Sequence, residues 1–255
     1  GMGSLIPDLQ NPLRGRSEDG LRPAGGMVRG SAKFGGIELG YDSDLDLVFL
    51  HDSSGEVQHT GGQQPVDNSV FFLRLVQRLV HLLTVHSAAG RLYEVDTRLR
   101  PSGKGGMLVQ SSDGFAAYQR EDAWTWEHQA LLRSRAVAGQ PALRERYEAL
   151  RVELLRHAVR RETLREDVRS MRERMRGELS RSGPGEFDLK QDAGGITDVE
   201  FLAQYWTLLW SARHAELVTY SDNIRQLESL ASICLVPQET VDVLTAAYRA
   251  YRQRL

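Results

Sequence analysis

Two aspartates, Asp44 and Asp46, lie two residues apart where a short apolar segment begins. The run over 45–50 is partly β-branched and follows a turn-like Asp-Ser, which predicts a buried strand. Side chains two residues apart in a strand point to the same face, so the two carboxylates project together. Because they repel each other, a divalent cation with oxygen ligands, Mg²⁺ or Mn²⁺, would compensate them. The alternative is that both aspartates are solvated at the entrance of the strand.

A second acidic strand and a glycine pair would complete such a site. The segment 92–97 predicts a strand in which Glu94 and Asp96 share one face, so that Asp96 supplies a third carboxylate. Such a site could hold two metal ions that clamp the attacking and leaving oxygens of an in-line phosphoryl displacement. Upstream, Gly35-Gly36 predicts a turn whose backbone N–H groups can approach a phosphate. A Gly-Gly pair alone is more often only a turn.

Helical periodicity connects and follows these strands. Apolar residues at helical spacing predict a helix from Asn68 or Ser69, as its cap, to about Ser87, which makes a βαβ-type unit with the two strands. After Ser112 almost the whole chain has helical patterning. The expected helices cover 112–121, 124–137, 141–158, 162–181, 197–212, 222–233 and 238 to the end.

The chain thus divides into three regions. Residues 1–26 are rich in proline and glycine without an apolar period, which is typical of a linker or a disordered segment. We expect an α+β protein, with a small mixed sheet and its helices over 27–140 and an all-helical bundle over 141–255. The chain ends inside a helical pattern, so we expect the bundle to be truncated at its C-terminus.

Composition narrows the class of protein. The 255 residues carry a formal charge of −2, which argues against a general nucleic-acid-binding surface, and the arginines of 141–181 are interleaved with glutamates. A single cysteine, Cys234, excludes an internal disulfide framework and a multi-cysteine zinc site. No apolar run is long enough to span a membrane. We expect a cytoplasmic protein that binds neither nucleic acid nor membrane.

Four segments in order resemble a known family. They are Lys33-Phe-Gly-Gly-Ile-Glu-Leu-Gly-Tyr-Asp-Ser-Asp-Leu-Asp46, Leu92-Tyr-Glu-Val-Asp-Thr-Arg-Leu-Arg-Pro-Ser102, Ala123-Trp-Thr-Trp-Glu-His-Gln-Ala130 and Phe187-Asp-Leu-Lys-Gln-Asp-Ala-Gly-Gly-Ile-Thr-Asp-Val-Glu-Phe201. Their order resembles the nucleotidyltransferase superfamily of DNA polymerase β, and most closely the glutamine synthetase adenylyltransferases. The resemblance covers about three quarters of the chain.

The resemblance implies a nucleotidyltransferase fold and an enzyme that uses ATP with Mg²⁺ or Mn²⁺. In that family one half adds AMP to a tyrosine of glutamine synthetase and a similar half removes it. The amino-acid sequences of the first and third segments resemble those of the C-terminal, AMP-adding half. The alternatives are the AMP-removing half, with orthophosphate as the attacking group, and a catalytically silent fragment that binds a PII-type signalling protein.

The resemblance also implies residue roles in the strand region. Asp44 and Asp46 match the metal-binding pair, and Asp96 matches the third catalytic carboxylate and is our candidate base. On the nucleotide side it implies Gly35, Gly36 and Ser43. The sequence adds Arg98, Arg100 and Lys104 as candidates for binding phosphate; the two arginines follow Asp96 at spacing two and should share its face. Alternatively, these arginines only pair with the acids, and Lys104 is only solvated.

Further candidates lie beside the other motifs. Lys33 lies just before the first Gly-Gly pair and Lys190 lies five residues before the end of the second, which Asp198 and Glu200 follow. The resemblance implies that this second segment faces the active-site cleft, together with Glu94. The alternative is that the two acids only favour the N-terminal dipole of a helix. The indoles of Trp124 and Trp126, finally, are more typical of packing between domains than of an adenine shelf.

Overall fold

The computed structural model describes residues 26–30, 44–53, 58–60, 64–87, 90–91 and 93–255. The described chain forms two compact units. The first, unit 1, comprises the described residues up to Tyr118 together with 136–148, and the second, unit 2, comprises 119–135 and 149–255. Lys33, Gly35, Gly36 and Ser43, like most of the predicted linker 1–26, lie outside the described residues.

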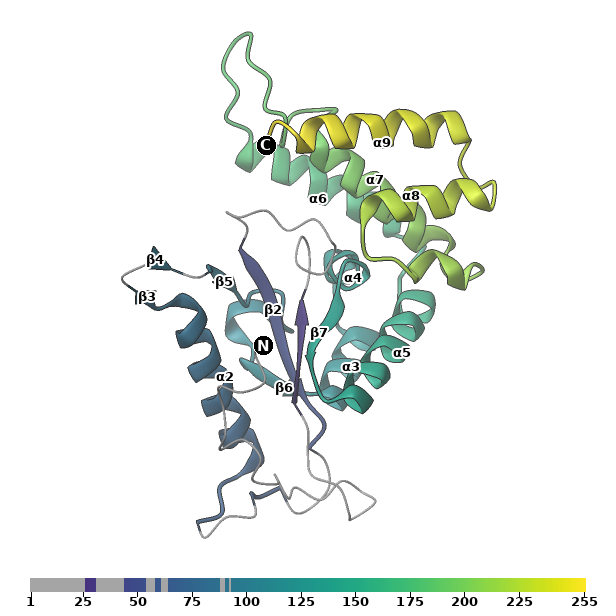
Figure 1. Ribbon diagram of the computed structural model, residues 1–255. Helices are drawn as coiled ribbons and strands as arrows, with labels where there is room; N and C mark the ends of the chain where they lie inside the picture. Colours follow the sequence, from purple (N-terminus) through teal and green to yellow (C-terminus); the bar gives the residue numbers. More distant parts are fainter. Residues whose placement is uncertain (1–25, 31–43, 54–57, 61–63, 88–89, 92) are drawn as a thin grey trace. The chain divides into compact units, whose positions relative to one another are not determined.

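Unit 1 is built on a small mixed sheet (Figure 1). Its strand order is β5-β2-β1-β7, and β6 also pairs with β2. β1 is antiparallel to β2, whereas β5 and β6 are parallel to it. The prediction of a mixed α+β protein with a small mixed sheet is therefore confirmed. The strands are β1 (Gly26–Gly30), β2 (Leu45–His51), β5 (Val95–Asp96), β6 (Val109–Ser111) and β7 (Arg135–Gly139).

The central strand β2 is apolar because both of its faces are covered. Leu45, Leu47 and Phe49 are buried as the alternating pattern predicts, but Val48 and Leu50 on the other face are buried as well. A strand buried on both faces is typical of the centre of a sheet. The polar side chains of β2 itself therefore lie at its two ends, at Asp46 and His51.

Helix α2 (Asn68–Thr84) joins β2 to the parallel strand β5, which confirms the predicted βαβ unit. The cap is neither of the two predicted residues but Asp67, whose Oδ1 accepts from the Ser69 N–H at 2.8 Å. The helix ends at Thr84, three residues early, and a hairpin of β3 (His86–Ser87) and β4 (Gly90–Arg91) follows. The predicted strand over 92–97 shortens to β5.

The predicted helix over 124–137 is wrong in its last part. Helix α4 (Thr125–Leu132) ends early, and β7 extends the sheet next to β1. Gly139 has a φ of +123°, and a Cβ there would lie 2.5 Å from the Met27 Cα. Glycine is therefore required where the two strands meet. The short strand β6 was also missed; it follows the 3-10 helix η2 (Gly103–Gly105) and leads into α3 (Ser112–Glu121).

Helices make up unit 2, close to where their periodicity predicts them. Helix α7 packs against α4, α6, α8 and α9. Its buried side chains share a core with the later helices, and Tyr248 of α9 is 1% exposed. Among the described residues, no helix has the length and hydropathy to cross a membrane. The helices are α5 (Pro141–His157), α6 (Leu164–Leu179), α7 (Ile196–Trp210), α8 (Asn223–Ser232) and α9 (Gln238–Arg252), with the 3-10 helix η3 (Ala215–Val218).

One buried arginine ties separate segments of unit 2 together. Arg151 of α5 is 2% exposed. Its guanidinium donates to the carbonyl oxygens of Ser134, Val218 and Leu132, at 2.9, 2.8 and 3.4 Å. A cation is favourable at the carboxyl end of a helix, here that of α4. Since α5 has residues in both units, the domain boundary between 140 and 141 stays a prediction.

Candidate active site

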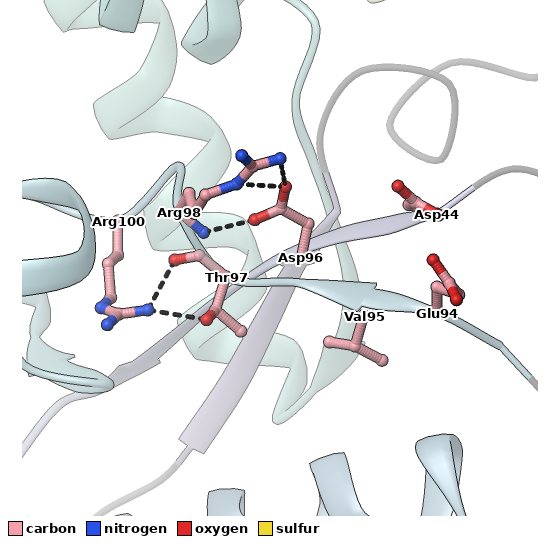
Figure 2. Close-up of a pocket in the computed structure, with 7 residues that line it drawn as sticks. All are labelled: Asp44, Glu94, Val95, Asp96, Thr97, Arg98 and Arg100. Carbon is pink, nitrogen blue, oxygen red and sulfur yellow. Dashed lines mark hydrogen bonds and ion pairs between the residues drawn. The ribbon is translucent and has the colours of Figure 1, made fainter.

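A cavity of about 390 Å³ opens where β2 begins and β5 ends. Asp44, Glu94 and Asp96 contribute carboxylates to it, and Arg98 and Arg100 contribute cations (Figure 2). Val95 and Thr97 complete the lining. Five of the candidates named from the sequence thus meet in one cavity. Carboxylates bind cations and guanidinium groups bind phosphate, so the chemistry of these side chains is that of a site for a cation and a phosphate.

Strand register brings the carboxylates together. β2 and β5 are parallel, and Asp46 lies opposite Asp96. The Leu45 N–H donates to the Glu94 carbonyl oxygen at 2.8 Å, which fixes this register. Asp44 immediately precedes β2, so three aspartates gather at one edge of the sheet. The predicted position of a third carboxylate on a neighbouring strand is therefore confirmed.

The charge of this group is only partly compensated. Burial, and then the charges of Asp96 and Asp44, raise the pKa of Asp46 to about 6, while Arg98 and Arg29 act in the opposite direction. The charged form of Asp46 is poorly solvated and lies beside two other carboxylates, whose charge Arg98 and Arg29 offset only in part. The oxygen donor set and this deficit fit a hard divalent cation. Within the described residues, however, no three acidic, histidine or cysteine side chains are already arranged around one ion position.

Arg98 holds Asp96 from two sides. Its backbone N–H donates to Oδ1 at 2.7 Å, and its Nε donates to Oδ2 at 2.7 Å. Its Nη2 forms an ion pair with the same Oδ2. Figure 2 shows the Asp96 carboxylate turned toward this guanidinium. The hydrogen bond and charge of Asp96 raise the pKa of Arg98 above its ordinary value.

Arg100 does not share this position. The strand ends at Asp96, so the alternation that predicts a common face for Arg98 and Arg100 does not continue. Instead, Arg100 donates from Nη1 to the Thr97 carbonyl oxygen and Oγ1, at 2.9 and 2.6 Å, and from Nε to the Gly106 carbonyl oxygen at 3.1 Å. Arg100 therefore stabilises the loop after β5, which includes Lys104 in η2.

A buried arginine near the carboxylates was missed. Arg29 of β1 lies opposite Val48 of β2, is 1% exposed, and has its guanidinium carbon 5.5 Å from the centre of the Phe115 ring. Its Nε has no hydrogen-bond partner among the described residues. A cation buried against an aromatic ring contributes positive charge near Asp46. Its neighbours in the sequence give no sign of this burial, because the ring that the guanidinium contacts belongs to another element.

The second acidic motif, Asp198 and Glu200, lies in unit 2, where both carboxylates contact arginines. Asp198 of α7 accepts from Arg172 Nε at 2.6 Å, from Arg176 Nη2 at 3.2 Å and from the Gly194 N–H at 2.7 Å. These contacts hold the start of α7 against α6. Two of these contacts are ion pairs with arginines, whereas the alternative that we kept for this motif invoked only the dipole of the helix.

The other candidates of this motif have structural contacts too. Glu200 lies 3.2 Å from Arg133 Nη1 and accepts from the Tyr248 hydroxyl at 3.2 Å. Lys190 is exposed on the turn before α7, and its N–H donates to Asp188 Oδ1 at 2.8 Å. A role for these residues in the cleft stays a prediction.

The aromatic motif lines a second cavity, of about 280 Å³, within unit 2. Trp124 caps α4 and is 67% exposed, and Trp126 is half-buried. Met171 and Arg174 of α6 lie across this cavity. The cavity contains no carboxylate besides Asp167, which accepts from Thr125 and Thr163. The indoles therefore line a largely apolar hollow on α4 and α6.

Comparison with known proteins agrees with the motifs. Residues 11–150 match the model of the family described as glutamate-ammonia ligase adenylyltransferase, and residues 163–254 match that of the PII-uridylyltransferases. Three similar proteins are each named bifunctional glutamine synthetase adenylyltransferase/adenylyl-removing enzyme.

These relatives are similar over nearly the whole chain. The protein of Thioalkalivibrio sulfidiphilus is 52% identical over 91% of this chain, and that of Nitrosococcus oceani is 49% identical over 93%. The protein of Hahella chejuensis is 50% identical over 88%. The aligned part is 24%, 25% and 24% of the relatives, so the chain spans about a quarter of their length.

Proposed function

The chain belongs to the glutamate-ammonia ligase adenylyltransferase family, and we propose that it transfers AMP from ATP to a tyrosine hydroxyl of glutamine synthetase. One observation carries this proposal. The parallel pairing of β2 and β5 sets Asp46 opposite Asp96, and Asp44 opens into the same cavity as Arg98. Transfer of a nucleotidyl group needs carboxylates that can bind a metal ion and, beside them, a positively charged side chain that can bind phosphate. The three aspartates and Arg98 provide these two features.

The residue roles follow from this arrangement. Asp44 and Asp46 would hold Mg²⁺ or Mn²⁺, with Asp96 beside them. The metal ions would supply charge that neutralises the phosphates and the leaving pyrophosphate. The tyrosine oxygen forms a bond to the α-phosphorus of ATP as the bond to pyrophosphate breaks. The phenol, with an ordinary pKa near 10, gives up its proton, for which Asp96 is our candidate acceptor.

The direction of the reaction is a finer proposal. The motifs around Asp44 and Trp124 resemble the AMP-adding half, and we assign the chain to it. The relatives' names contain both activities. In the AMP-removing alternative, orthophosphate attacks the AMP phosphorus and ADP is released. Incubating adenylylated glutamine synthetase with phosphate and the chain would produce ADP only under that alternative.

We also propose the wider organisation expected from the sequence. Residues 27–140 would form the nucleotidyltransferase domain, and 141–255 a helical bundle. Because 163–254 match the PII-uridylyltransferase model, a PII-type signalling protein is our candidate for a second partner. We propose a cytoplasmic location, where glutamine synthetase and ATP are both available.

The decisive test combines Asp44→Asn with Asp46→Asn. Both changes keep the shape of the side chains and remove the charge that would hold the metal, so AMP transfer should fall by about 10²-fold or more. Transfer is measured with radiolabelled ATP and purified glutamine synthetase. Asp113→Asn is the matched control, because Asp113 is exposed and pairs with Arg146 on the surface. Undiminished transfer by the double variant would overturn the assignment.

A silent binding fragment makes the opposite prediction. Such a fragment would not bind ATP in a Mg²⁺-dependent way, whereas the proposed enzyme would. Calorimetric titration of the wild-type chain with Mg²⁺ and a non-hydrolysable ATP analogue separates the two. The Asp44→Asn, Asp46→Asn variant serves as the reference for binding that does not involve the carboxylates.

A further inference from the structure

The Asp96 carboxylate has one oxygen fixed by the backbone and the other held by a side chain. Oδ1 accepts from the Arg98 backbone N–H at 2.7 Å. Oδ2 accepts from Arg98 Nε at 2.7 Å and is the atom that pairs with Nη2. A rotation of the Arg98 side chain would therefore release Oδ2 and leave Oδ1 in place. The carboxylate would keep its orientation while Oδ2 lost its contacts with that guanidinium.

The two partners differ in exposure. The Arg98 side chain is 65% exposed, whereas that of Asp96 is 15% exposed. An ion pair with one member in solvent contributes little to stability, so it breaks easily when a better partner arrives. A guanidinium binds phosphate oxygens with the same fork of N–H donors that it offers to a carboxylate. Arg98 is thus free to turn on its solvent side, and Asp96 is not.

We propose that Arg98 exchanges partners, holding Asp96 Oδ2 in the free protein and moving to the triphosphate of the incoming nucleotide. This rests on the proposed function and adds an order of events to it. Departure of the guanidinium frees Oδ2 for the cation that accompanies the nucleotide. The positive charge that Arg98 supplied to the carboxylates is replaced by that cation, so the site keeps its balance of charge.

Arg100 provides a contrast within the same cavity. Its guanidinium is bonded to Thr97 and Gly106, which makes it part of the loop after β5. Figure 2 shows it turned toward Thr97, on the other side of Thr97 from the Arg98 guanidinium. Removing Arg100 takes the same unit of positive charge from the cavity as removing Arg98 does. The pair of variants therefore separates partner exchange from a general change of charge.

The first measurement is Mn²⁺ affinity without nucleotide, from the electron paramagnetic resonance signal of free Mn²⁺. Arg98→Ala should bind Mn²⁺ about three- to fivefold more tightly than wild type, because no guanidinium competes for Oδ2. Arg100→Ala should stay within about twofold of wild type. In the presence of Mg²⁺, Arg98→Ala should bind inorganic tripolyphosphate about tenfold more weakly. Circular dichroism checks that each variant is folded.

The second measurement observes Arg98 directly. In protein labelled with ¹⁵N-arginine, the Nε–H resonance of Arg98 is identified by its loss in Arg98→Lys. It should move when Mg²⁺ and a non-hydrolysable ATP analogue are added, as Nε changes its acceptor. A resonance unchanged at saturating nucleotide would show a permanent pair with Asp96 and overturn the exchange.

The outcomes also separate this inference from the proposed function. Wild-type protein that binds Mn²⁺ and tripolyphosphate, with equal Mn²⁺ affinity in Arg98→Ala, contradicts the exchange alone. An equal gain in Arg98→Ala and Arg100→Ala contradicts it too, because the gain then follows from charge. Wild-type protein that binds neither Mn²⁺ nor tripolyphosphate overturns both the exchange and the proposed function.

Discussion

The acidic group at β2 and β5 and the acidic residues at the start of α7 resemble each other in sequence but differ in how their charge is compensated. Asp46 faces two other aspartates and has a pKa near 6. Asp198 faces two arginines and accepts a backbone hydrogen bond. One group keeps an excess of negative charge that a ligand can neutralise, whereas the other is already neutralised by the protein. Compensation of charge, rather than the spacing of acids, separates a candidate site from a structural anchor.

The local fold explains the difference. Acids on parallel strands are brought side by side by the register, and the rest of β2 behind them is apolar and buried. Acids in the first turn of a helix are near N–H donors and the positive end of the dipole. There, Arg172 and Arg176 of the preceding helix reach the same carboxylate. Aspartates therefore form a candidate cation site in the first environment and structural ion pairs in the second.

The largest expected effect is at the anchor. Asp198→Ala would leave Arg172, whose side chain is 7% exposed, without its carboxylate. Removing one partner of a largely buried pair should lower the free energy of unfolding by about 2–4 kcal/mol and the melting temperature by about 5–10 °C. Thermal unfolding followed by circular dichroism measures this. Asp44→Ala is the control and should not lower the melting temperature; a larger loss there than in Asp198→Ala would reverse the comparison.

A smaller effect of opposite sign is expected at Asp46. Its pKa is about 6 in the folded protein, above the ordinary value of 3.8 for an aspartate. Because the folded-state pKa is the higher one, stability falls as pH rises from about 4 to about 6 and stays low above that range. Asp46→Asn removes this loss and should stabilise the protein by about 1–3 kcal/mol at pH 8.

The gain of Asp46→Asn should shrink toward pH 4, where the wild-type carboxyl is protonated in the folded state. Urea unfolding at pH 4, 6 and 8, without divalent cations, gives the profile. A variant that is destabilised equally at every pH would mean that Asp46 is an anchor like Asp198.

Divalent cations should act on only one of the two groups. At a Mg²⁺ or Mn²⁺ concentration ten times the dissociation constant, binding to the folded state stabilises by about 1.4 kcal/mol. We expect this increment in the wild type and in Asp198→Ala, and its loss in Asp44→Asn combined with Asp46→Asn. Differential scanning calorimetry with and without the cation measures it. An increment that survives in the double variant would place the cation elsewhere.

The smallest expected change in stability is at an exposed ion pair of unit 2, which serves as a reference for the buried pair of Asp198. Arg120 and Glu153 form a pair at 2.9 Å, but their side chains are 47% and 42% exposed. Glu153→Gln should therefore change the free energy of unfolding by less than about 0.5 kcal/mol. The same unfolding measurement applies. If this exposed pair matters as much as Asp198, burial is not the reason for the strength of the anchor.

Local patterns in the sequence were enough for the parts of the fold that they determine. The period-two acids and the apolar run gave β2, and helical periodicity gave α2 and the later helices with small errors at their ends. The position of Asp96 on a strand next to β2 also followed, because a βαβ connection makes neighbouring parallel strands. These features depend on residues that are close in the sequence.

Features that depend on distant partners were not predictable in this way. The end of α4 and the strand β7 depend on pairing with β1, more than a hundred residues earlier. Arg98 and Arg100 follow one strand pattern, yet the strand ends at Asp96 and sends them to different acceptors. Burial of Arg29 requires the Phe115 ring of another element. No local signal contains these partners.

The three carbonyl contacts of Arg151 also decide how the chain can be divided for study. A piece that begins at 141 retains the guanidinium but lacks Leu132 and Ser134, so a buried cation would lose the acceptors that these two residues supply. The helical unit can therefore not be isolated with a single cut. A segment covering 119–135 would have to be supplied as well, as a fused sequence or as a separate peptide that restores the fold by complementation.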